Sequence, residues 1–204
     1  MLSGAVAMVG WALMSNRDIY ISADIEADGP IPGGYSMLSF GFVVAATFDG
    51  ETFAPSAEAE TFYRELKPVG KECLPEAIAA SGLDRDELMR VGTEPVEAMS
   101  DAAAWVKSVA AGARPVLVGY PIVFDWMFLH WYFVTFCGES PFGFSGALDM
   151  KTMYQQKAHV PLEGAGRNDL PSELRASQPH THNALDDARE QAEIFNKLFL
   201  WSGR

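Results

Sequence analysis

The sequence predicts an α/β fold, a single domain in which helices flank a mixed β-sheet. The 204-residue chain is long enough for one domain with a sizeable buried core. Its 49% hydrophobic and 21% charged residues are ordinary for a folded globular protein. Strand and helix patterns alternate in the order β-β-β-α-α-β-α-β-α, which is typical of a mixed sheet with helices on its faces.

The first residues do not fit this pattern. Residues 1–14 are mostly small and apolar, but no Lys or Arg precedes them as in a signal peptide, and Arg17 comes too late. We expect residues 1–17 to be a non-structural extension, with Met14 as a candidate start, and residues 18–204 to form the domain. A targeting role is the alternative. No run reaches the roughly eighteen apolar residues of a membrane span, so we expect no membrane association.

Three strand patterns open the domain. Residues 18–25 alternate and are rich in β-branched side chains, which predicts a strand. The Gly and Pro residues of 29–34 cannot continue it and predict a loop. Residues 36–48 form the second predicted strand, which ends at the turn signal Asp49-Gly50, and residues 61–66 form the third. The sheet therefore begins with antiparallel strands.

Helix patterns dominate the middle of the chain. Residues 75–81 predict a short helix closed by Gly82, and residues 93–95 resemble a helix start with a hydroxyl and a proline. Apolar residues then recur at spacings of three and four up to residue 110, so one face of this helix is buried. The apolar run 115–120 predicts an interior strand.

The last part mixes helices with one irregular segment. Residues 125–137 carry aromatic side chains nearly all round, which predicts a helix in the core or at a homodimer interface rather than a base-stacking surface. Residues 147–149 open another short element. Residues 160–180 are polar with scattered Gly and Pro, so we expect an irregular loop. Residues 185–198 predict a C-terminal amphipathic helix.

Charge and cysteine content narrow the class of protein. A net charge of −12 argues against extensive non-specific binding of duplexes, which usually requires a basic face. It does not exclude a nucleic-acid enzyme, since clustered carboxylates become electropositive once they bind divalent cations. Cys73 and Cys137 fit neither a disulfide framework nor a metal cluster, so we expect them to be reduced and buried in a cytoplasmic protein.

Asp24 and Glu26 are the first candidate site residues. Side chains two apart on a strand point to the same face, so these carboxylates lie side by side at the end of a hydrophobic strand. Two neighbouring buried carboxylates are unfavourable unless cations neutralise them. Divalent ions that prefer oxygen ligands, Mg²⁺ or Mn²⁺, are the natural partners. Alone, an Asp-x-Glu pair is more often a solvated strand end.

Two further segments carry candidate residues. Asp125 follows the apolar strand and begins the aromatic helix, where the helix dipole favours a carboxylate and a plain cap is the alternative. His182 lies just before the last helix, and Asp187 stands in the first turn at the margin of the apolar stripe. An imidazole that titrates near neutral pH can take a proton from an attacking water. His180 and Asp186 are neighbouring alternatives.

Together these residues resemble a known family. Asp24-x-Glu26, Asp125 after a strand, and His182-x-Ala184-x-x-Asp187 are similar to the motif of the DEDDh 3′–5′ exonucleases of the RNase H-like superfamily. The resemblance extends from about Asp18 to Trp201. Further agreements and departures also bear on it. The agreements are Leu38-Ser39-Phe40-Gly41, Leu74-Pro75-Glu76-Ala77-Ile78 with Ser81-Gly82-Leu83, and Leu148-Asp149. The departures are Pro121, where the family often has Asn, and Ser39, where many members have Glu.

The resemblance implies an RNase H-like exonuclease domain that uses two Mg²⁺ or Mn²⁺ ions to hydrolyse phosphodiester bonds. It implies that Asp24 bridges both ions, that Glu26 and Asp187 complete one site, and that Asp125 helps to hold the second ion. The family spacing selects His182 over His180 as the base that deprotonates water, and Asp187 over Asp186 as the ligand. The resemblance also implies that the products are nucleoside 5′-monophosphates released from 3′ ends.

The substrate is less defined than the chemistry. The acidic charge and the lack of a basic stripe favour single-stranded or short nucleic acid, and we expect RNA rather than DNA. Tyr35 and Met37, beside the Gly- and Pro-rich loop, are the candidates for contacts with a base. Two alternatives remain: a metal-dependent phosphohydrolase acting on a small nucleotide, and a nucleic-acid-binding module of the same fold that has no catalytic activity.

Overall fold

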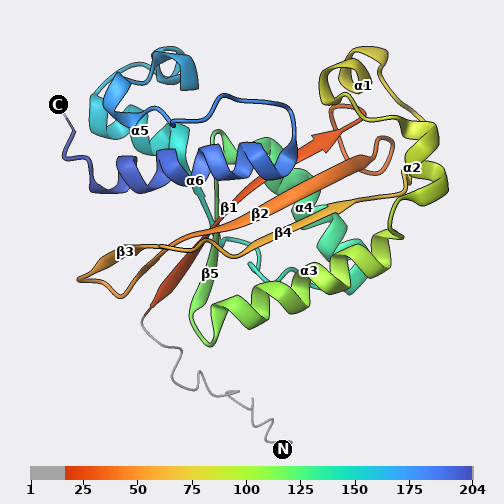
Figure 1. Ribbon diagram of the computed structural model, residues 1–204, viewed down its shortest axis with the longest axis horizontal. Coiled ribbons are helices and arrows are strands. Elements are labelled where there is room, and N and C mark those ends of the chain that lie inside the picture. Colours follow the sequence, from red (N-terminus) through yellow and green to blue (C-terminus); the bar gives the residue numbers. More distant parts are fainter. Residues whose placement is uncertain (1–16, 204) are drawn as a thin grey trace, which may run out of the picture.

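A mixed β-sheet with strand order β3-β2-β1-β5-β6, in which β4 also pairs with β2, runs through the molecule (Figure 1). The computed structural model describes residues 17–203. The elements are β1 (Asp18–Ala27), β2 (Met37–Phe48), β3 (Phe53–Pro55), β4 (Thr61–Glu65), α1 (Pro75–Ser81), α2 (Arg85–Val91), α3 (Pro95–Ala110), β5 (Arg114–Gly119), α4 (Ile122–Cys137), β6 (Ala147–Asp149), α5 (Met150–Ala158), the 3₁₀ turns η1 (Leu162–Ala165), η2 (Arg167–Asp169) and η3 (Ser172–Leu174), and α6 (Ala184–Leu200).

Strand β1 is the centre of the sheet. It pairs antiparallel with β2 along its whole length, from Asp18 opposite Phe48 to Ala27 opposite Met37. On its other side it pairs in parallel with β5, but only from Asp18 to Ser22. The last residues of β1 therefore extend past β5. This combination of antiparallel and parallel pairs confirms the predicted mixed sheet.

The alternation of side chains along β1 divides the core into two layers. Ile21, Ala23 and Ile25 pack with α3 and α4 on one face of the sheet. Tyr20 packs on the opposite face with α5 and α6, which lie together across the sheet in Figure 1. Because successive strand residues point to opposite faces, Asp24 and Glu26 share the face of Tyr20. The sheet thus directs both carboxylates toward α6.

Small residues let α6 approach the sheet closely. Gly41 of β2 lies opposite Asp24 of β1 in the antiparallel register. A Cβ atom at Gly41 would lie 2.6 Å from the carbonyl oxygen of Ala184 and 2.6 Å from the Cα of Leu185. Ala184 itself is fully buried. Glycine in the second strand and alanine at the helix start therefore have a shared physical reason, which is the close packing of α6 on β2.

The aromatic helix α4 belongs mainly to the core, as predicted. Phe128, Tyr132 and Phe133 are fully buried beneath the sheet. The hydroxyl group of Tyr132 accepts a hydrogen bond from the N–H of Met37 over 2.7 Å, so the helix also fixes the start of β2. The helix begins at Ile122, three residues before the predicted start at Asp125. Its N-cap is Pro121, which follows a cis peptide bond.

Several predictions of local structure need correction. Helix α2 and the short strand β3 were not predicted, and residues 160–180 contain three 3₁₀ turns rather than loop alone. Cys73 and Cys137 are free, as expected, but Cys73 is exposed and Cys137 is half-buried. Apart from Arg17, the predicted N-terminal extension lies outside the described residues. Among residues 17–203, no helix has the length and apolar character needed to cross a membrane.

Candidate active site

Three carboxylates meet between β1 and α6. Asp24 and Glu26 come from the end of β1, and Asp187 comes from the first turn of α6. Each contributes a carboxylate oxygen, and these oxygens lie within 4.8 Å of one another. Asp187 is fully buried, whereas Asp24 and Glu26 are half-buried and accessible. The structure therefore brings together three of the four predicted metal ligands as one group of oxygen donors.

Asp125 joins the group from the other layer of the fold. It is buried in the first turn of α4, and its Oδ1 accepts a hydrogen bond from the backbone N–H of Ile25 over 3.1 Å. Strand β1 has no β5 partner at this point, so the Ile25 N–H is available. Burial raises the pKa of Asp125 to about 7, although its backbone hydrogen bonds and Arg167 act to lower it.

The cluster is electrostatically unfavourable without a counter-charge. Burial, followed by the charges of Asp125, Glu26 and Asp187, raises the pKa of Asp24 well above its usual value. Burial, followed by Asp187 and Asp125, raises the pKa of Glu26 to about 8. Both shifts favour the protonated form, because like charges in a poorly hydrated site repel one another. Divalent cations would reverse this preference by neutralising the carboxylates.

Asp187 is held by the backbone just before α6. Its Oδ1 accepts hydrogen bonds from the N–H and hydroxyl of Thr181 at 2.7 and 3.1 Å. Its Oδ2 accepts a hydrogen bond from the N–H of His182 over 2.8 Å. His182 adopts a left-handed backbone conformation with φ of 60°, which is uncommon for residues other than glycine. These hydrogen bonds therefore hold the first turn of α6, which carries Asp187, and the backbone of Thr181 and His182 in position relative to each other.

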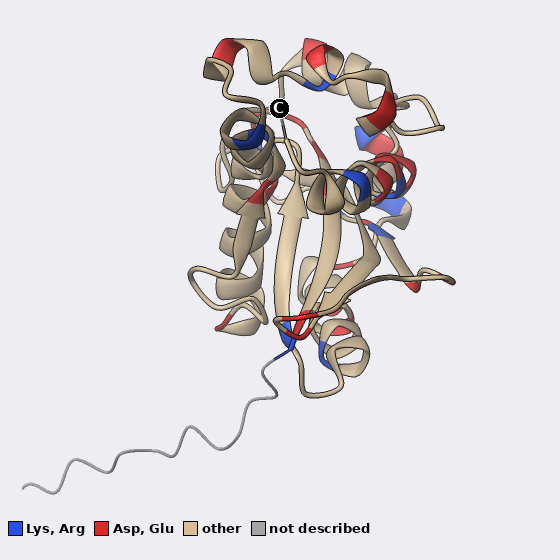
Figure 2. Cartoon of the chain, turned by 90° about the vertical axis from the view of Figure 1, so that its left-hand side faces the viewer, with Lys and Arg blue, Asp and Glu red and all other residues tan. Residues whose placement is uncertain are grey.

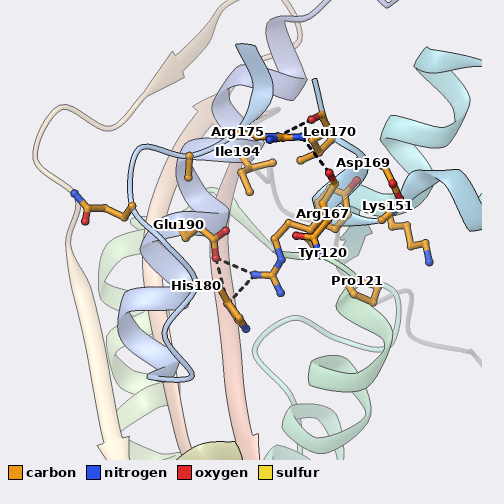
Figure 3. A pocket seen from close by; sticks show the side chains of 14 residues that line it. Tyr120, Pro121, Lys151, Arg167, Asp169, Leu170, Arg175, His180, Glu190 and Ile194 are labelled. Atoms are coloured by element: carbon orange, nitrogen blue, oxygen red, sulfur yellow. Dashed lines mark hydrogen bonds and ion pairs between the residues drawn. The ribbon is translucent and has the colours of Figure 1, made fainter. Parts of the chain in front are cut away.

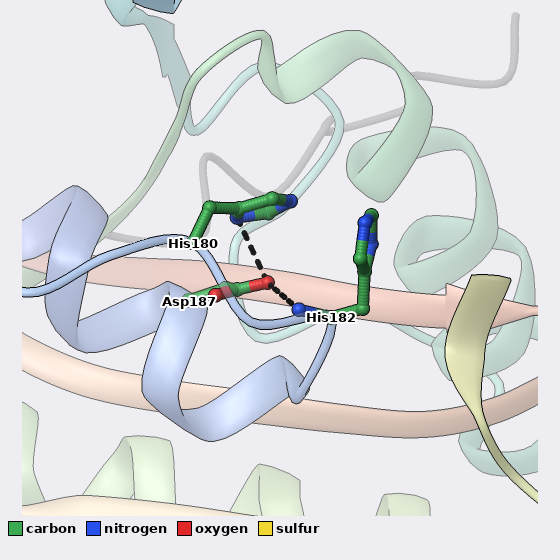
Figure 4. A group of neighbouring side chains, drawn as sticks. All are labelled: His180, His182 and Asp187. Atoms are coloured by element: carbon green, nitrogen blue, oxygen red, sulfur yellow. Dashed lines mark hydrogen bonds and ion pairs between the residues drawn. The ribbon is translucent and has the colours of Figure 1, made fainter.

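Both histidines before α6 lie beside Asp187 (Figure 4). The Nδ1 atom of His180 is 2.9 Å from Asp187 Oδ2, and the His180 and His182 ring centroids are 4.7 Å apart. Both histidines are exposed residues. Their closeness to Asp187 places both within reach of the carboxylate cluster. Asp186, in contrast, is exposed and pairs with Arg189, which agrees with the choice of Asp187 over Asp186 as the ligand.

Two polar residues of the site were not predicted. The Nε2 atom of Gln191 donates a hydrogen bond to Asp24 Oδ1 over 2.7 Å, and its Oε1 accepts one from the N–H of Tyr120. Gln191 stands one helical turn after Asp187, so a polar residue at this buried position was a usable signal. Arg167 acts to lower the pKa of both Asp24 and Asp125. It lies in a segment predicted as loop, where no sequence signal distinguished it.

A cavity of about 680 Å³ lies beside the cluster (Figure 3). Its lining includes Lys151, Arg167, Arg175, His180 and Glu190. Arg167 donates a hydrogen bond to Glu190 over 2.8 Å and lies 2.9 Å from Nδ1 of His180. Part of the cavity wall is therefore basic, although the guanidinium group of Arg167 is already paired with a buried carboxylate.

The two residues predicted to contact a base, Tyr35 and Met37, differ in their exposure. Tyr35 is half-buried and packs against Gly29, where a Cβ atom would clash with its ring. Tyr35 therefore remains a candidate. Met37 is fully buried in the core among residues of β1 and α4, which removes its side chain from any surface that a base could contact. The expectation for Met37 is corrected on this ground.

In the view of Figure 2, the basic residues are not confined to one element of the fold. The cartoon shows Lys and Arg positions on several elements, interspersed with Asp and Glu positions. The chain as a whole carries a net charge of −12. This distribution agrees with the expectation that the protein does not hold long duplexes through their phosphates.

Comparison with known proteins supports the same class of enzyme. No protein-family model matches the sequence. The 3′–5′ DNA exonuclease Cap18 of Escherichia coli is 36% identical over 187 residues, which are 91% of this chain and 94% of Cap18. The nuclease domain of 3′hExo, a DEDDh family member bound to rAMP, has a similar structure, with a TM-score of 0.65, 14% identity and coverage of 93% of this chain and 96% of that domain.

Longer nucleases share the fold over part of their length. Exonuclease I of E. coli in complex with a dA16 oligonucleotide matches with a TM-score of 0.57 and 17% identity, over 89% of this chain and 40% of that one. The chain also spans 66% of a 3′-exonuclease structure that recognises the histone mRNA stem-loop. These likenesses show the fold, and the identity with Cap18 over almost its full length shows the family. The chain belongs to the family of 3′–5′ exonucleases that includes Cap18, and it has the RNase H-like fold of the DEDDh exonucleases.

Proposed function

We propose that this exonuclease removes nucleotides one at a time from the 3′ end of single-stranded DNA with the help of two Mg²⁺ or Mn²⁺ ions. The observation that carries the proposal is the convergence of oxygens from Asp24, Glu26 and Asp187 within 4.8 Å. Two of these residues lie on β1 and the third lies on α6, more than 150 residues away. Acidic residues that cluster by chance are exposed on the surface, whereas Asp187 is fully buried. Burial of a carboxylate is rare unless it has a partner, so the cluster is not a chance one.

The donor atoms fit hard divalent cations. All are carboxylate oxygens, which Mg²⁺ and Mn²⁺ prefer, and the raised pKa values of Asp24 and Glu26 indicate that the group needs positive charge. Asp24, Glu26, Asp187 and Asp125 would hold the ions. When bound, two such ions generate a nucleophile from water at neutral pH and stabilise the attacking and leaving oxygens.

The other residues of the site support this chemistry. We assign the role of general base to His182, which is exposed beside the cluster and can accept the proton of the attacking water. Gln191 orients Asp24 through its hydrogen bond. Arg167 offsets part of the negative charge at Asp24 and Asp125, since its guanidinium acts to lower the pKa of both. Tyr35 is our candidate for contact with the terminal base.

Two observations favour single-stranded DNA as the substrate. The relative that is 36% identical over 91% of the chain is a DNA exonuclease, which favours DNA over the RNA expected from the sequence. The net charge of −12 and the scattered Lys and Arg residues disfavour a long duplex. RNA remains the alternative polymer, and dinucleotides remain the alternative length.

A substrate comparison tests this proposal. The purified protein is incubated with Mg²⁺ or Mn²⁺ and 5′-labelled single-stranded DNA, RNA of the same sequence, or dinucleotides. We expect a ladder that shortens from the 3′ end and faster cleavage of DNA. Faster cleavage of RNA would contradict the assignment of DNA, and preference for the dinucleotides would contradict the assignment of a longer strand.

A further inference from the structure

A second group of metal-ligating atoms adjoins the carboxylate cluster. One nitrogen of His180, one nitrogen of His182 and one carboxylate oxygen of Asp187 lie within 4.8 Å of one another (Figure 4). Asp187 also belongs to the oxygen group with Asp24 and Glu26. One carboxylate is therefore shared by two groups of different chemistry, one made only of oxygens and one rich in nitrogen.

The nitrogen-rich group suits a different ion. Two imidazoles and a carboxylate are ligands that Zn²⁺ binds well, and three protein ligands leave one position of a tetrahedral ion open. Mg²⁺ has little preference for imidazole nitrogen. We propose that His180, His182 and Asp187 bind a single Zn²⁺ ion, and that this ion inhibits the exonuclease.

The geometry requires only small movements of exposed side chains. In a tetrahedral zinc site with bonds of about 2.0–2.1 Å, neighbouring ligand atoms lie about 3.3 Å apart. Nδ1 of His180 and Oδ2 of Asp187 are already 2.9 Å apart. The His182 ring is exposed and can rotate toward them, whereas Asp187 is buried and held by two backbone N–H groups. The fixed ligand is thus in place, and the adjustable ligand has room to move.

The surroundings of His180 are compatible with an added cation. Glu190 is buried and places Oε2 3.2 Å from His180 Nδ1. Arg167 lies at 2.9 Å from the same nitrogen, but it is paired with Glu190 over 2.8 Å, so the two charges offset each other.

Binding of zinc at this position would disable two functions at once. Zinc would occupy a carboxylate oxygen of Asp187, which would leave the oxygen group with Asp24 and Glu26 less able to hold its own ions. The His182 nitrogen would be occupied by the ion and could not accept a proton from water. Inhibition should therefore be relieved by more Mg²⁺ or Mn²⁺, because both groups compete for Asp187. This consequence rests on the function proposed above, whereas zinc binding itself does not.

Calorimetric titration of Zn²⁺ into the metal-free protein tests the site directly. His180→Gln and His182→Gln should each raise the zinc Kd at least about tenfold, since each removes one of three ligands. Glu26→Gln, which removes a member of the oxygen group only, should leave the zinc Kd within about twofold. His159→Gln, at the exposed end of α5, is the matched control and should do the same. A weaker zinc affinity in Glu26→Gln but not in His180→Gln, or no zinc binding by the wild type, would overturn the proposal.

An activity titration tests the inhibition separately. Zinc is added at fixed Mg²⁺ with single-stranded DNA, and the rate of each protein is divided by its own rate without zinc. We expect His180→Gln to need at least about ten times more zinc for half-inhibition than wild type. Equal sensitivity of the two proteins would contradict inhibition through this site. If the wild type binds zinc through the histidines but cleaves neither DNA nor RNA, the zinc site stands and the proposed function fails.

Discussion

Gln191 ties helix α6 to strand β1, because its Nε2 donates a hydrogen bond to Asp24 Oδ1 over 2.7 Å. The same amide accepts a hydrogen bond from the N–H of Tyr120 through Oε1, and the side chain is buried. One residue therefore sets the position of Asp24 and provides the hydrogen-bond acceptor for the backbone N–H that follows β5. This relationship leads to the first prediction.

Replacing Gln191 with Leu should reduce both activity and stability. The change leaves the buried Tyr120 N–H without its partner, which costs about 1–3 kcal/mol of the free energy of unfolding. The loss of orientation at Asp24 should weaken metal affinity or turnover by about 10–100-fold. Urea unfolding and metal titration measure the two effects. Gln156→Leu, on the exposed face of α5, is the control, and an equal loss in both variants would refute a specific role for Gln191.

Asp125 should show a difference between its Asn and Ala variants. Asn keeps an oxygen that can accept the hydrogen bond from Ile25, whereas Ala leaves that N–H unpaired. We expect the metal-free Asp125→Ala protein to be about 1–3 kcal/mol less stable than Asp125→Asn, while both lose metal-dependent activity. Urea unfolding without metal provides the measurement. Equal stability of the two variants would mean that the hydrogen bond to Ile25 contributes nothing.

Gly41→Ala tests the close packing of α6 on the sheet. The added Cβ atom would meet the backbone of Ala184 and Leu185 at 2.6 Å, so the helix start that carries Asp187 must shift. We expect a loss of about 1–3 kcal/mol in the free energy of unfolding, with reduced activity. Gly164→Ala is the matched control, since a Cβ there meets nothing within 4 Å. A stable and fully active Gly41→Ala protein would contradict this packing.

Metal binding should depend on pH through Glu26. Its pKa is raised to about 8 from an ordinary value of 4.5, so the folded metal-free protein retains a proton that the unfolded chain releases. The stability of the metal-free protein should therefore fall as pH rises from about 5 to about 8. Over the same range metal affinity should increase, because the ion must displace that proton.

Thermal unfolding with and without Mg²⁺, repeated at several pH values, measures this dependence. Glu26→Gln removes one of the titrating carboxyl groups and should reduce the fall in stability of the metal-free protein, while Asp24 and Asp125 keep part of it. Asp84→Asn, at the exposed N-cap of α2, leaves the cluster unchanged and should behave like wild type in this pH dependence. Metal affinity that falls with rising pH would show that the sign of the pKa shift is wrong.

The sequence predicted those features of the site that follow from local periodicity. Strand alternation placed Asp24 and Glu26 on one face, which the structure confirms, and the structure adds that this face meets α6. The sequence placed Asp187 at the margin of the apolar stripe, and in the structure its side chain is fully buried. The small residues at 41 and 184, noted as family features, acquire a physical reason in the contact between β2 and α6.

Features that depend on tertiary contacts could not be predicted. Arg167 reaches the cluster from a short 3₁₀ turn, and no periodicity marks such a segment. Met37 stands near a loop in the sequence, which suggested an accessible position. It is the first residue of β2, however, and α4 covers its side chain. Helix α2 is only seven residues long and leaves a weak pattern. The homodimer and the cytoplasmic location stay predictions.

The release of nucleoside 5′-monophosphates from the 3′ end of labelled single-stranded DNA, compared among wild type, Asp24→Asn and His182→Ala, tests the central claim most directly. We predict metal-dependent release by wild type and none detectable with Asp24→Asn. His182→Ala should be slower by about 10²–10⁴-fold, with Mg²⁺ or Mn²⁺ affinity largely kept, because for these ions His182 is a base rather than a ligand. Full activity of Asp24→Asn, or no metal-dependent cleavage by wild type on DNA, RNA or dinucleotides, would contradict the account.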